Sequence, residues 1–184
     1  MNILITGVGG QGVVLASKLL AQCGILLGQS AHTAETIGMA QRGGSVTSHV
    51  RLGAAHSPLI PRGGADVLLA FEPAEAARNI AFLKPDGALV VSNRGIAPSG
   101  ADYAPAEVLA WLRANARRIT ELDADALFAA TGSYRGLNVA LIGASAGLLG
   151  ISPGTVESAL RGLLGDARAE QNFAALRFGA GAAG

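Results

Sequence analysis

Residues 2–26 read NILITGVGGQGVVLASKLLAQCGIL, and this stretch decides the fold. Its first part, Asn2 to Thr6, is a short apolar run that is typical of a buried strand and stops at Gly7. From Gln11 an apolar-rich stretch continues to about Leu27, which is long enough for a helix. Glycines separate the two runs and permit a tight turn. The chain therefore opens with a strand, a glycine turn and a helix, which is the beginning of an α/β unit.

Further strands and helices alternate after this unit. We expect strands at Gln29 to Glu35, Ser45 to Leu52, Asp66 to Phe71, Ala88 to Ser92 and Arg118 to Leu122. We expect helices from Pro73 to just before Pro85, from Ala104 to Ala116 and, in several pieces, from Asp123 to Phe178. Asp86-Gly87 predicts a turn into the fourth of these strands. The order predicts a three-layer α/β/α domain over residues 1–184, with a mostly parallel Rossmann-like sheet, a helical C-terminal third and a frayed end at 179–184.

Composition narrows the classes of function. The 184 residues carry a formal net charge of +1, and the lysines and arginines are scattered among acids, so no basic stripe is present to bind nucleic acid. No stretch approaches the ~18 apolar residues that a membrane helix needs, and no export signal precedes the first strand. We therefore expect a cytoplasmic protein. Cys23 is the single cysteine, so this chain alone cannot form a disulfide or hold an iron–sulfur cluster, and its apolar surroundings predict an inert buried thiol.

The glycine turn is the first candidate site. Gly7, Gly9 and Gly12 form a G-x-G-x-x-G pattern between a strand and a helix, a context in which backbone amides can hold a pyrophosphate. Glu35 lies near the position of a ribose-binding acid, although slightly late. The same glycines would also serve a tight turn without any nucleotide. Residues typical of hydride transfer, such as a Tyr-x-x-x-Lys motif, are missing, which argues against a complete dehydrogenase.

The second candidate site follows the expected second strand. Gly38-Met39-Ala40-Gln41-Arg42-Gly43-Gly44 leads into a strand with period-two alternation, Ser45 to Leu52. Arg42 offers a planar fork for a carboxylate or a phosphate, and the glycines permit unusual backbone shapes. This loop suits docking or anion binding, and the alternative is a mobile turn with a solvated arginine. His49 and Arg51 share the polar face of the strand, for which an ordinary exposed face is the simpler interpretation, while Asn138 is expected to begin a buried helix.

These motifs together resemble a known family. Gly7-Val8-Gly9-Gly10-Gln11-Gly12, the run Gly38 to Gly44 and the strand Ser45 to Arg51 occur in an order similar to the small (beta) subunit of indolepyruvate:ferredoxin oxidoreductases. The likeness continues through Tyr134 to Gly143 and Asn172-Phe173-Ala174, and it extends to the gamma domain of the pyruvate and 2-ketoisovalerate oxidoreductases.

The resemblance implies a shared reaction, the CoA-dependent oxidative decarboxylation of an aryl 2-oxoacid to an acyl-CoA with electrons passed to ferredoxin. It implies that a large (alpha) subunit carries thiamine diphosphate and [4Fe–4S] clusters, and that this chain holds no catalytic residue or metal and shows little activity alone. The residues that match the family's motifs are Gly7, Gly9, Gly10, Gln11, Gly12, Arg42, Gly43 and Gly44. Contact with CoA and contact with the large subunit are both open for them, as is a homodimer of the isolated chain. The alternative is a free-standing NAD(P)- or CoA-binding Rossmann-like protein, with Glu35 at a ribose.

Overall fold

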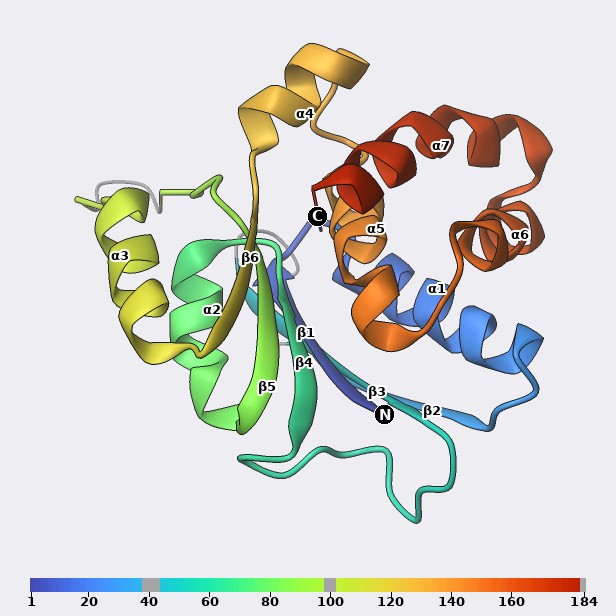
Figure 1. Ribbon diagram of the computed structural model, residues 1–184, viewed down its shortest axis with the longest axis horizontal. Coiled ribbons are helices and arrows are strands. Elements are labelled where there is room, and N and C mark those ends of the chain that lie inside the picture. The colour runs from blue at the N-terminus through green and yellow to red at the C-terminus, as the bar shows by residue number, and fades with distance from the viewer. Residues whose placement is uncertain (38–43, 98–101, 183–184) are drawn as a thin grey trace.

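The computed structural model describes residues 1–37, 44–97 and 102–182. These residues form one six-stranded sheet in the order β2-β3-β1-β4-β5-β6 (Figure 1). The strands are β1 (Asn2–Val8), β2 (Ala31–Ile37), β3 (Ser45–Leu52), β4 (Ala65–Ala70), β5 (Leu83–Ser92) and β6 (Arg118–Leu122). The helices are α1 (Val13–Leu26), α2 (Pro73–Asn79) with the 3-10 turn η1 (Ile80–Phe82), α3 (Pro105–Asn115), α4 (Ala124–Thr131), α5 (Leu137–Leu149), α6 (Pro153–Leu164) and α7 (Asp166–Gly181).

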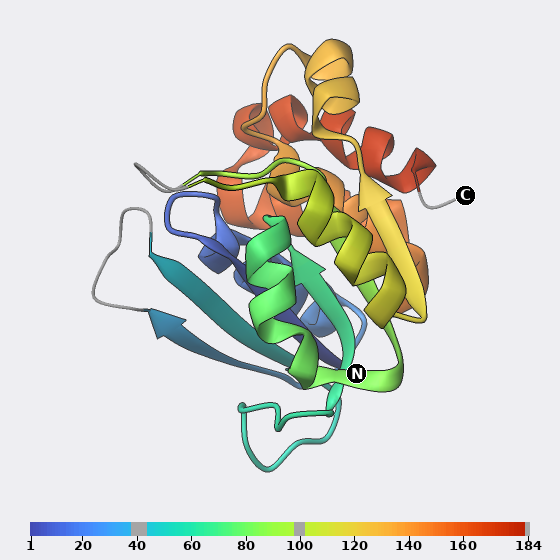
Figure 2. The same ribbon diagram turned by 90° about the vertical axis from the view of Figure 1, so that its left-hand side faces the viewer.

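Helices cover both faces of the sheet. α2 and α3 lie on one face, and α1, α5, α6 and α7 lie on the other, while α4 projects beyond the end of the sheet (Figures 1 and 2). Two separate apolar cores result, the larger between the sheet and the α1–α5–α6–α7 layer and the smaller under α2 and α3. The predicted three-layer architecture with a helical C-terminal third is confirmed. No helix within residues 1–37, 44–97 and 102–182 has the length and apolar character needed to cross a bilayer.

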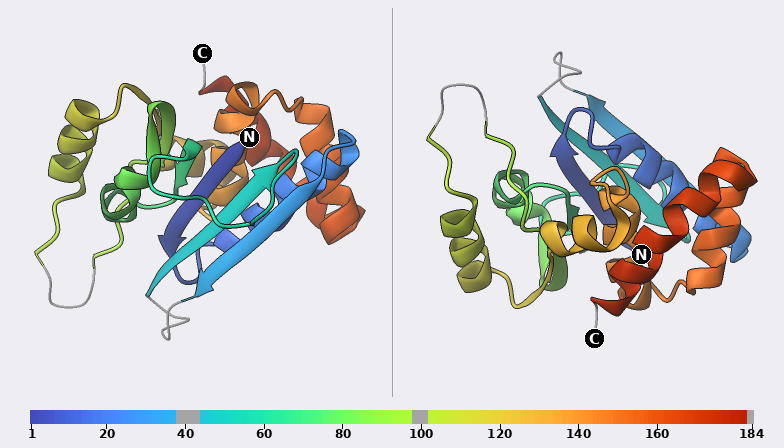
Figure 3. Two further views of the ribbon diagram at one scale, coloured as in Figure 1. Left: turned by 90° about the horizontal axis from the view of Figure 1, so that it is seen from below. Right: turned by 90° about the horizontal axis from the view of Figure 1, so that it is seen from above.

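One strand runs against the others. β1, β4, β5 and β6 pair in parallel, whereas β3 is antiparallel to both β1 and β2. β2 therefore ends, and β3 begins, at the end of the sheet where β1 also ends, as Figure 3 shows. This pairing places the end of β2 and the start of β3 at the same end of the sheet as the glycine turn.

Two expectations about the elements were wrong. Asp86-Gly87 makes no turn, because β5 runs unbroken from Leu83 to Ser92 and a register shift against β4, between Ala65 and Val67, accommodates the extra residues. Gly179 to Gly181, where we expected fraying to begin, belong to α7, while residues 183–184 lie outside the described residues. Gly179 packs against Ala140 of α5, and tertiary contact therefore keeps a glycine-rich end helical.

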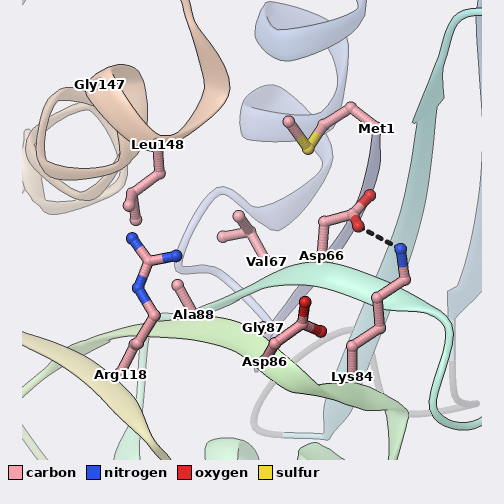
Figure 4. A pocket seen from close by; sticks show the side chains of 10 residues that line it. All are labelled: Met1, Asp66, Val67, Lys84, Asp86, Gly87, Ala88, Arg118, Gly147 and Leu148. Atoms are coloured by element: carbon pink, nitrogen blue, oxygen red, sulfur yellow. Dashed lines mark hydrogen bonds and ion pairs between the residues drawn. The ribbon is translucent and has the colours of Figure 1, made fainter.

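A polar pocket lies at the amino end of the parallel strands, opposite the glycine turn. It encloses about 500 Å³, and Figure 4 shows the Lys84 ammonium paired with the Asp66 carboxylate at its rim. The Asn2 amide also donates to Asp66 Oδ2 at 2.6 Å. Partial burial opposes ionisation of Asp66, but these hydrogen bonds and the charges of Lys84 and the N-terminus outweigh it and lower the pKa of Asp66. The pair fastens β5 and β1 to the start of β4.

Asp66→Asn should cost about 1 kcal/mol of unfolding free energy at pH 7, because a partly exposed ion pair contributes little more than that. The folded pKa lies below the unfolded value, so the contribution is present above the unfolded pKa and disappears as the pH falls through the folded pKa. Urea unfolding of both proteins at pH 7 and in the acid range checks this. If the difference in unfolding free energy between the two proteins stayed constant down to pH values below both the folded and the unfolded pKa of Asp66, the stabilising role of the Asp66 carboxylate would be contradicted.

Candidate functional site

The glycine turn joins β1 to α1 at the carboxyl edge of the sheet. Gly10 and Gly12 have positive φ angles of 99° and 84°, which other residues rarely adopt. α1 begins at Val13, two residues later than Gln11, where we expected it, because Gly12 occupies the position before the helix. A Cβ atom on Gly7 would lie 2.8 Å from Gln11 Oε1 and 3.1 Å from Phe71 Cβ, so a side chain does not fit there.

The side chain of Gln11 fills the crevice between the ends of β1 and β4. Its Oε1 accepts a hydrogen bond from the Val8 amide at 2.6 Å, and its Nε2 donates to the Phe71 carbonyl at 3.1 Å. The Gln11 amide donates to the Val8 carbonyl at 3.1 Å and the Gly9 amide to the Gly44 carbonyl at 2.9 Å. Three amides of the turn are thus already satisfied within the protein. In a dinucleotide-binding turn, by contrast, such amides are left unpaired and donate to the diphosphate of the ligand.

An apolar hollow of about 370 Å³ lies beside the turn. It is lined by Val8, Gly9, Gly10, Gly12, Val13, Val14 and Val46. The first turn of α1 borders it, so helix amides and their partial positive charge face a space that is otherwise lined by valines. This lining can hold an apolar chain or a partner's side chain next to a polar group.

The structure brings the two predicted motifs together. Gly44 meets Gly9 through the 2.9 Å hydrogen bond, and Ser45 is the register partner of Val8 on β1. Arg42 and Gly43 lie outside the described residues. Gly9, Gly10 and Gly12 line the hollow and lie next to Gly44 at the carboxyl edge, with Gln11 in the same turn, whereas Gly7 is buried behind Gln11.

Glu35 does not occupy the position of a ribose-binding acid. In a dinucleotide-binding domain the acid ends a strand that lies next to the first one. Here β3 separates β2 from β1, and Glu35 Oε1 accepts a hydrogen bond from Ser17 Oγ of α1 at 3.3 Å. The sequence spacing was close to that of a ribose acid, but the inserted antiparallel strand moves Glu35 away from the glycine turn, and the dinucleotide interpretation loses its support.

Two buried carboxylates at the carboxyl edge were missed by the sequence analysis. Glu72 and Glu75, at the start of α2, are 2% and 1% exposed. Glu72 caps the helix, because its Oε2 accepts from the Glu75 amide at 2.9 Å, and its other oxygen accepts from the Tyr103 hydroxyl. Glu75 accepts from Ser45 Oγ at 2.5 Å and pairs with Arg78. The only sequence signal was an acid followed by Pro73 directly after a buried strand.

The buried acids fasten separate segments to the carboxyl edge. Ser45 ties the start of β3 to α2, and Tyr103 ties the segment before α3 to the same helix, because its oxygen also accepts from the Ala74 amide at 3.2 Å. Burial, together with the hydrogen bond to Glu72 and its negative charge, raises the pKa of Tyr103. The phenol therefore remains a hydrogen-bond donor at neutral pH, and the arrangement positions segments rather than supplying a nucleophile.

His49 was placed wrongly on an exposed face. Its side chain is 6% exposed because the segment after β3 folds over it, and its Nδ1 accepts from the Ile60 amide at 3.1 Å. Burial lowers the pKa of His49, which keeps it neutral. Arg51 donates to the Ser57 carbonyl at 2.8 Å and so holds the same segment. Asn138, as expected, lies in the first turn of α5, where it packs against Gly12.

Cys23 lies on α1 with no exposed surface, and burial raises the pKa of its thiol to about 12. We therefore expect the native protein to react with thiol reagents at pH 8 only as fast as it opens locally, whereas the urea-unfolded chain reacts at the rate of a free thiol. Timed absorbance assays with a disulfide reagent measure both rates. Complete labelling of the folded protein within seconds would contradict the burial of Cys23.

Metal-ligating side chains do not gather anywhere in the described part of the chain. The sequence has one cysteine, which is buried, and within residues 1–37, 44–97 and 102–182 no three His, Cys, Asp or Glu side chains gather in a way that could hold a metal ion. Residues 2–182 match the family described as pyruvate ferredoxin/flavodoxin oxidoreductase. The chain belongs to this family. Its single buried thiol does not fit an iron–sulfur cluster, which needs several thiolates.

Two archaeal relatives align with this chain over nearly its full length. It is 37% identical to indolepyruvate oxidoreductase subunit IorB of Archaeoglobus fulgidus, over 97% of this chain and 93% of the relative. It is 32% identical to the protein of the same name from Methanothermobacter thermautotrophicus, over 99% and 97%. The chain is also similar to the gamma subunit of a keto/oxoacid ferredoxin oxidoreductase from Geobacter sulfurreducens, with a TM-score of 0.73 and 25% identity over 99% of this chain and 97% of that one.

The fold also occurs within a longer oxidoreductase chain. A 2-oxoglutarate:ferredoxin oxidoreductase from Magnetococcus marinus matches 100% of this chain and 31% of its own chain, with a TM-score of 0.74 and 23% identity. The same fold thus spans nearly all of the Geobacter sulfurreducens chain and about a third of the Magnetococcus marinus chain.

Proposed function

We propose that this chain, a small subunit of a 2-oxoacid:ferredoxin oxidoreductase, serves an enzyme whose substrate is indolepyruvate or another aryl pyruvate. The observation that carries the proposal is the full-length similarity to two proteins named indolepyruvate oxidoreductase subunit IorB. The reaction would convert the 2-oxoacid and CoA into an acyl-CoA and carbon dioxide and pass an electron pair to ferredoxin. The alternative of a free-standing NAD(P)-binding protein is not favoured, because Glu35 lies away from the glycine turn and the relatives are oxidoreductase subunits.

The proposed division of labour places thiamine diphosphate and the [4Fe–4S] clusters on a large partner subunit. When bound to that partner, thiamine diphosphate would supply the electron-accepting chemistry for decarboxylation, and the clusters would carry the electrons. The single, buried cysteine of this chain agrees with that assignment. So do the consecutive apolar residues Ile25, Leu26 and Leu27 at the end of α1, which are all exposed and offer apolar surface to another protein.

The carboxyl edge is the proposed working surface of the subunit. Gly9, Gly10, Gln11, Gly12 and Gly44 would form this surface beside the apolar hollow, buried Gly7 would shape the turn behind it, and Glu75 holds the start of β3 in place through Ser45. Arg42 and Gly43 are included in this proposed surface only because they match the family's sequence motif. The surface would contact the large subunit or CoA, and in either case it orients and binds without breaking a bond.

Co-expression with a tagged large subunit that carries thiamine and cluster motifs tests the assembly. The two chains should co-purify in equal amounts, and the complex should reduce ferredoxin with a higher kcat/KM for indolepyruvate than for pyruvate or 2-oxoglutarate. Failure of the two chains to associate at micromolar concentration would overturn the subunit role. A preference for pyruvate would leave that role intact and overturn the substrate assignment.

A further inference from the structure

A second pocket lies between the N-terminal turn of α1, the segment that leads into α5 and one face of α7. It encloses about 450 Å³ and shares no lining residue with the hollow beside the glycine turn. Arg168, Gln171, Asn172 and Ala175 contribute from α7. Their spacing of three and four residues places them on the same side of the helix. Arg168 and Gln171 are exposed and Asn172 is half-buried, so their polar groups are accessible to a molecule in the pocket.

The other wall of the pocket is fixed in shape. Thr131 Oγ1 donates to the Leu127 carbonyl at 2.8 Å and to the Ser133 carbonyl at 3.0 Å, and Ser133 Oγ accepts from the Arg135 amide at 3.1 Å. Gly136 then passes so close to α7 that a Cβ atom there would lie 2.6 Å from Ala175 Cβ. This close approach sets Arg135 beside the face of α7 that carries Arg168.

The pocket has two guanidinium groups and no acid to neutralise them. Within residues 1–37, 44–97 and 102–182, neither Arg135 nor Arg168 has a carboxylate within ion-pair distance. The acids of α6 and α7 are committed elsewhere: Asp166 and Glu170 pair with Arg161, and Glu157 pairs with Arg177. Leu15 also lines the pocket from the first turn of α1, which adds the partial positive charge of a helix N-terminus. Both charged side chains that line this space are therefore positive, and the negative contributions from the described part of the chain are the partial charges at the C-termini of α4 and α6, where Thr131 and Leu164 line it.

We propose that this pocket binds a small organic molecule through a phosphate group. A carboxylate has two oxygens and is satisfied by one guanidinium fork, whereas a phosphate monoester presents three oxygens and can engage both forks together with the amide of Gln171. Leu15, Leu164 and Ala175 supply apolar surface for the rest of the ligand, and the volume falls in the range of small-molecule sites. The site goes beyond the proposed function, because it requires neither the large subunit nor the glycine turn.

Titration of the isolated full-length chain with phenyl phosphate, followed by calorimetry and by amide NMR shifts, tests the proposal. Phenyl phosphate should bind more tightly than inorganic phosphate, which lacks the apolar body, and more tightly than benzoate, which has one carboxylate in place of the phosphate. Shifts should concentrate at Leu15, Gln171 and Asn172. Arg135→Gln and Arg168→Gln should each weaken binding about tenfold, the effect of losing one charged fork.

Arg62→Gln is the matched control, because Arg62 is exposed and lies outside the pocket lining, and the affinity should stay within about twofold of the parent value. The substituted arginines are exposed, so circular dichroism and the melting temperature should remain those of the parent protein. Affinity retained in the Arg135→Gln/Arg168→Gln double variant, equal binding of benzoate, or the absence of phenyl phosphate binding at tens of millimolar would each overturn the proposal. None of these outcomes bears on assembly with the large subunit.

Discussion

Gly179→Ala should lower the free energy of unfolding by about 3 kcal/mol or more, because backbone atoms of two helices occupy the space of the new methyl group. A Cβ atom on Gly179 of α7 would lie 1.8 Å from the Ala140 carbonyl oxygen of α5. Gly143 of α5 meets α7 in the same way, 2.3 Å from the Leu176 carbonyl oxygen. The two helices therefore cross at backbone contact, and a methyl group at either glycine forces them apart and opens the larger core.

Gly147→Ala is the control on the same pair of helices. Gly147 lies inside α5 with open space around its Cα, so alanine should stabilise the protein by roughly 0.5–1 kcal/mol through helix propensity alone. Urea unfolding of the three proteins, monitored by circular dichroism, gives both differences. Equal and small effects at positions 179 and 147 would contradict the close crossing of α5 and α7.

Gly12→Ala should lower the free energy of unfolding by roughly 2–3 kcal/mol, because the left-handed backbone is unfavourable for alanine and its methyl group meets a steric conflict. Gly12 has a φ angle of 84°, and a Cβ atom there would lie 2.4 Å from Nδ2 of Asn138, a side chain that is only 6% exposed and has little room to move. Gly10→Ala separates the two causes, because Gly10 also has a positive φ of 99° but has open space around it. We expect about 1 kcal/mol for Gly10→Ala, from backbone strain alone.

Removing the obstructing side chain should restore part of the loss. In the Gly12→Ala/Asn138→Ala double variant the methyl group has space. The double variant should therefore lose less unfolding free energy than the two single variants lose together. Thermal and urea unfolding of the four proteins supply this cycle. A Gly12→Ala variant no less stable than Gly10→Ala would show that Asn138 does not pack on the turn.

Local pattern was sufficient for most elements of the fold. The strands Ser45–Leu52 and Arg118–Leu122 have the predicted bounds, because period-two alternation and flanking turn residues are local properties. The Asp86-Gly87 turn was wrong because the register shift against β4 depends on a neighbouring strand. His49 was wrong because the segment that buries it comes later in the chain. Pattern within one segment does not carry information about what will cover it.

The candidate site was predicted in part. The glycine turn and Gly44 were identified from their residue types, and their meeting depends on the antiparallel β3, which no local pattern revealed. Glu72 and Glu75 were missed because their partners Tyr103 and Ser45 lie about thirty residues away in the sequence. Glu35 matched a familiar spacing but lies on a strand that does not touch β1.

Our central claim is that this chain binds and orients but depends on a companion for every bond-breaking and electron-carrying group. The most direct measurement is the rate of ferredoxin reduction with indolepyruvate and CoA for this chain alone, for the large subunit alone and for the large subunit titrated with this chain. We predict no turnover by this chain alone and an activity that rises with added chain and saturates at equal amounts of the two subunits. Enzymatic turnover by this chain alone, or full activity of the large subunit without it, would contradict the account.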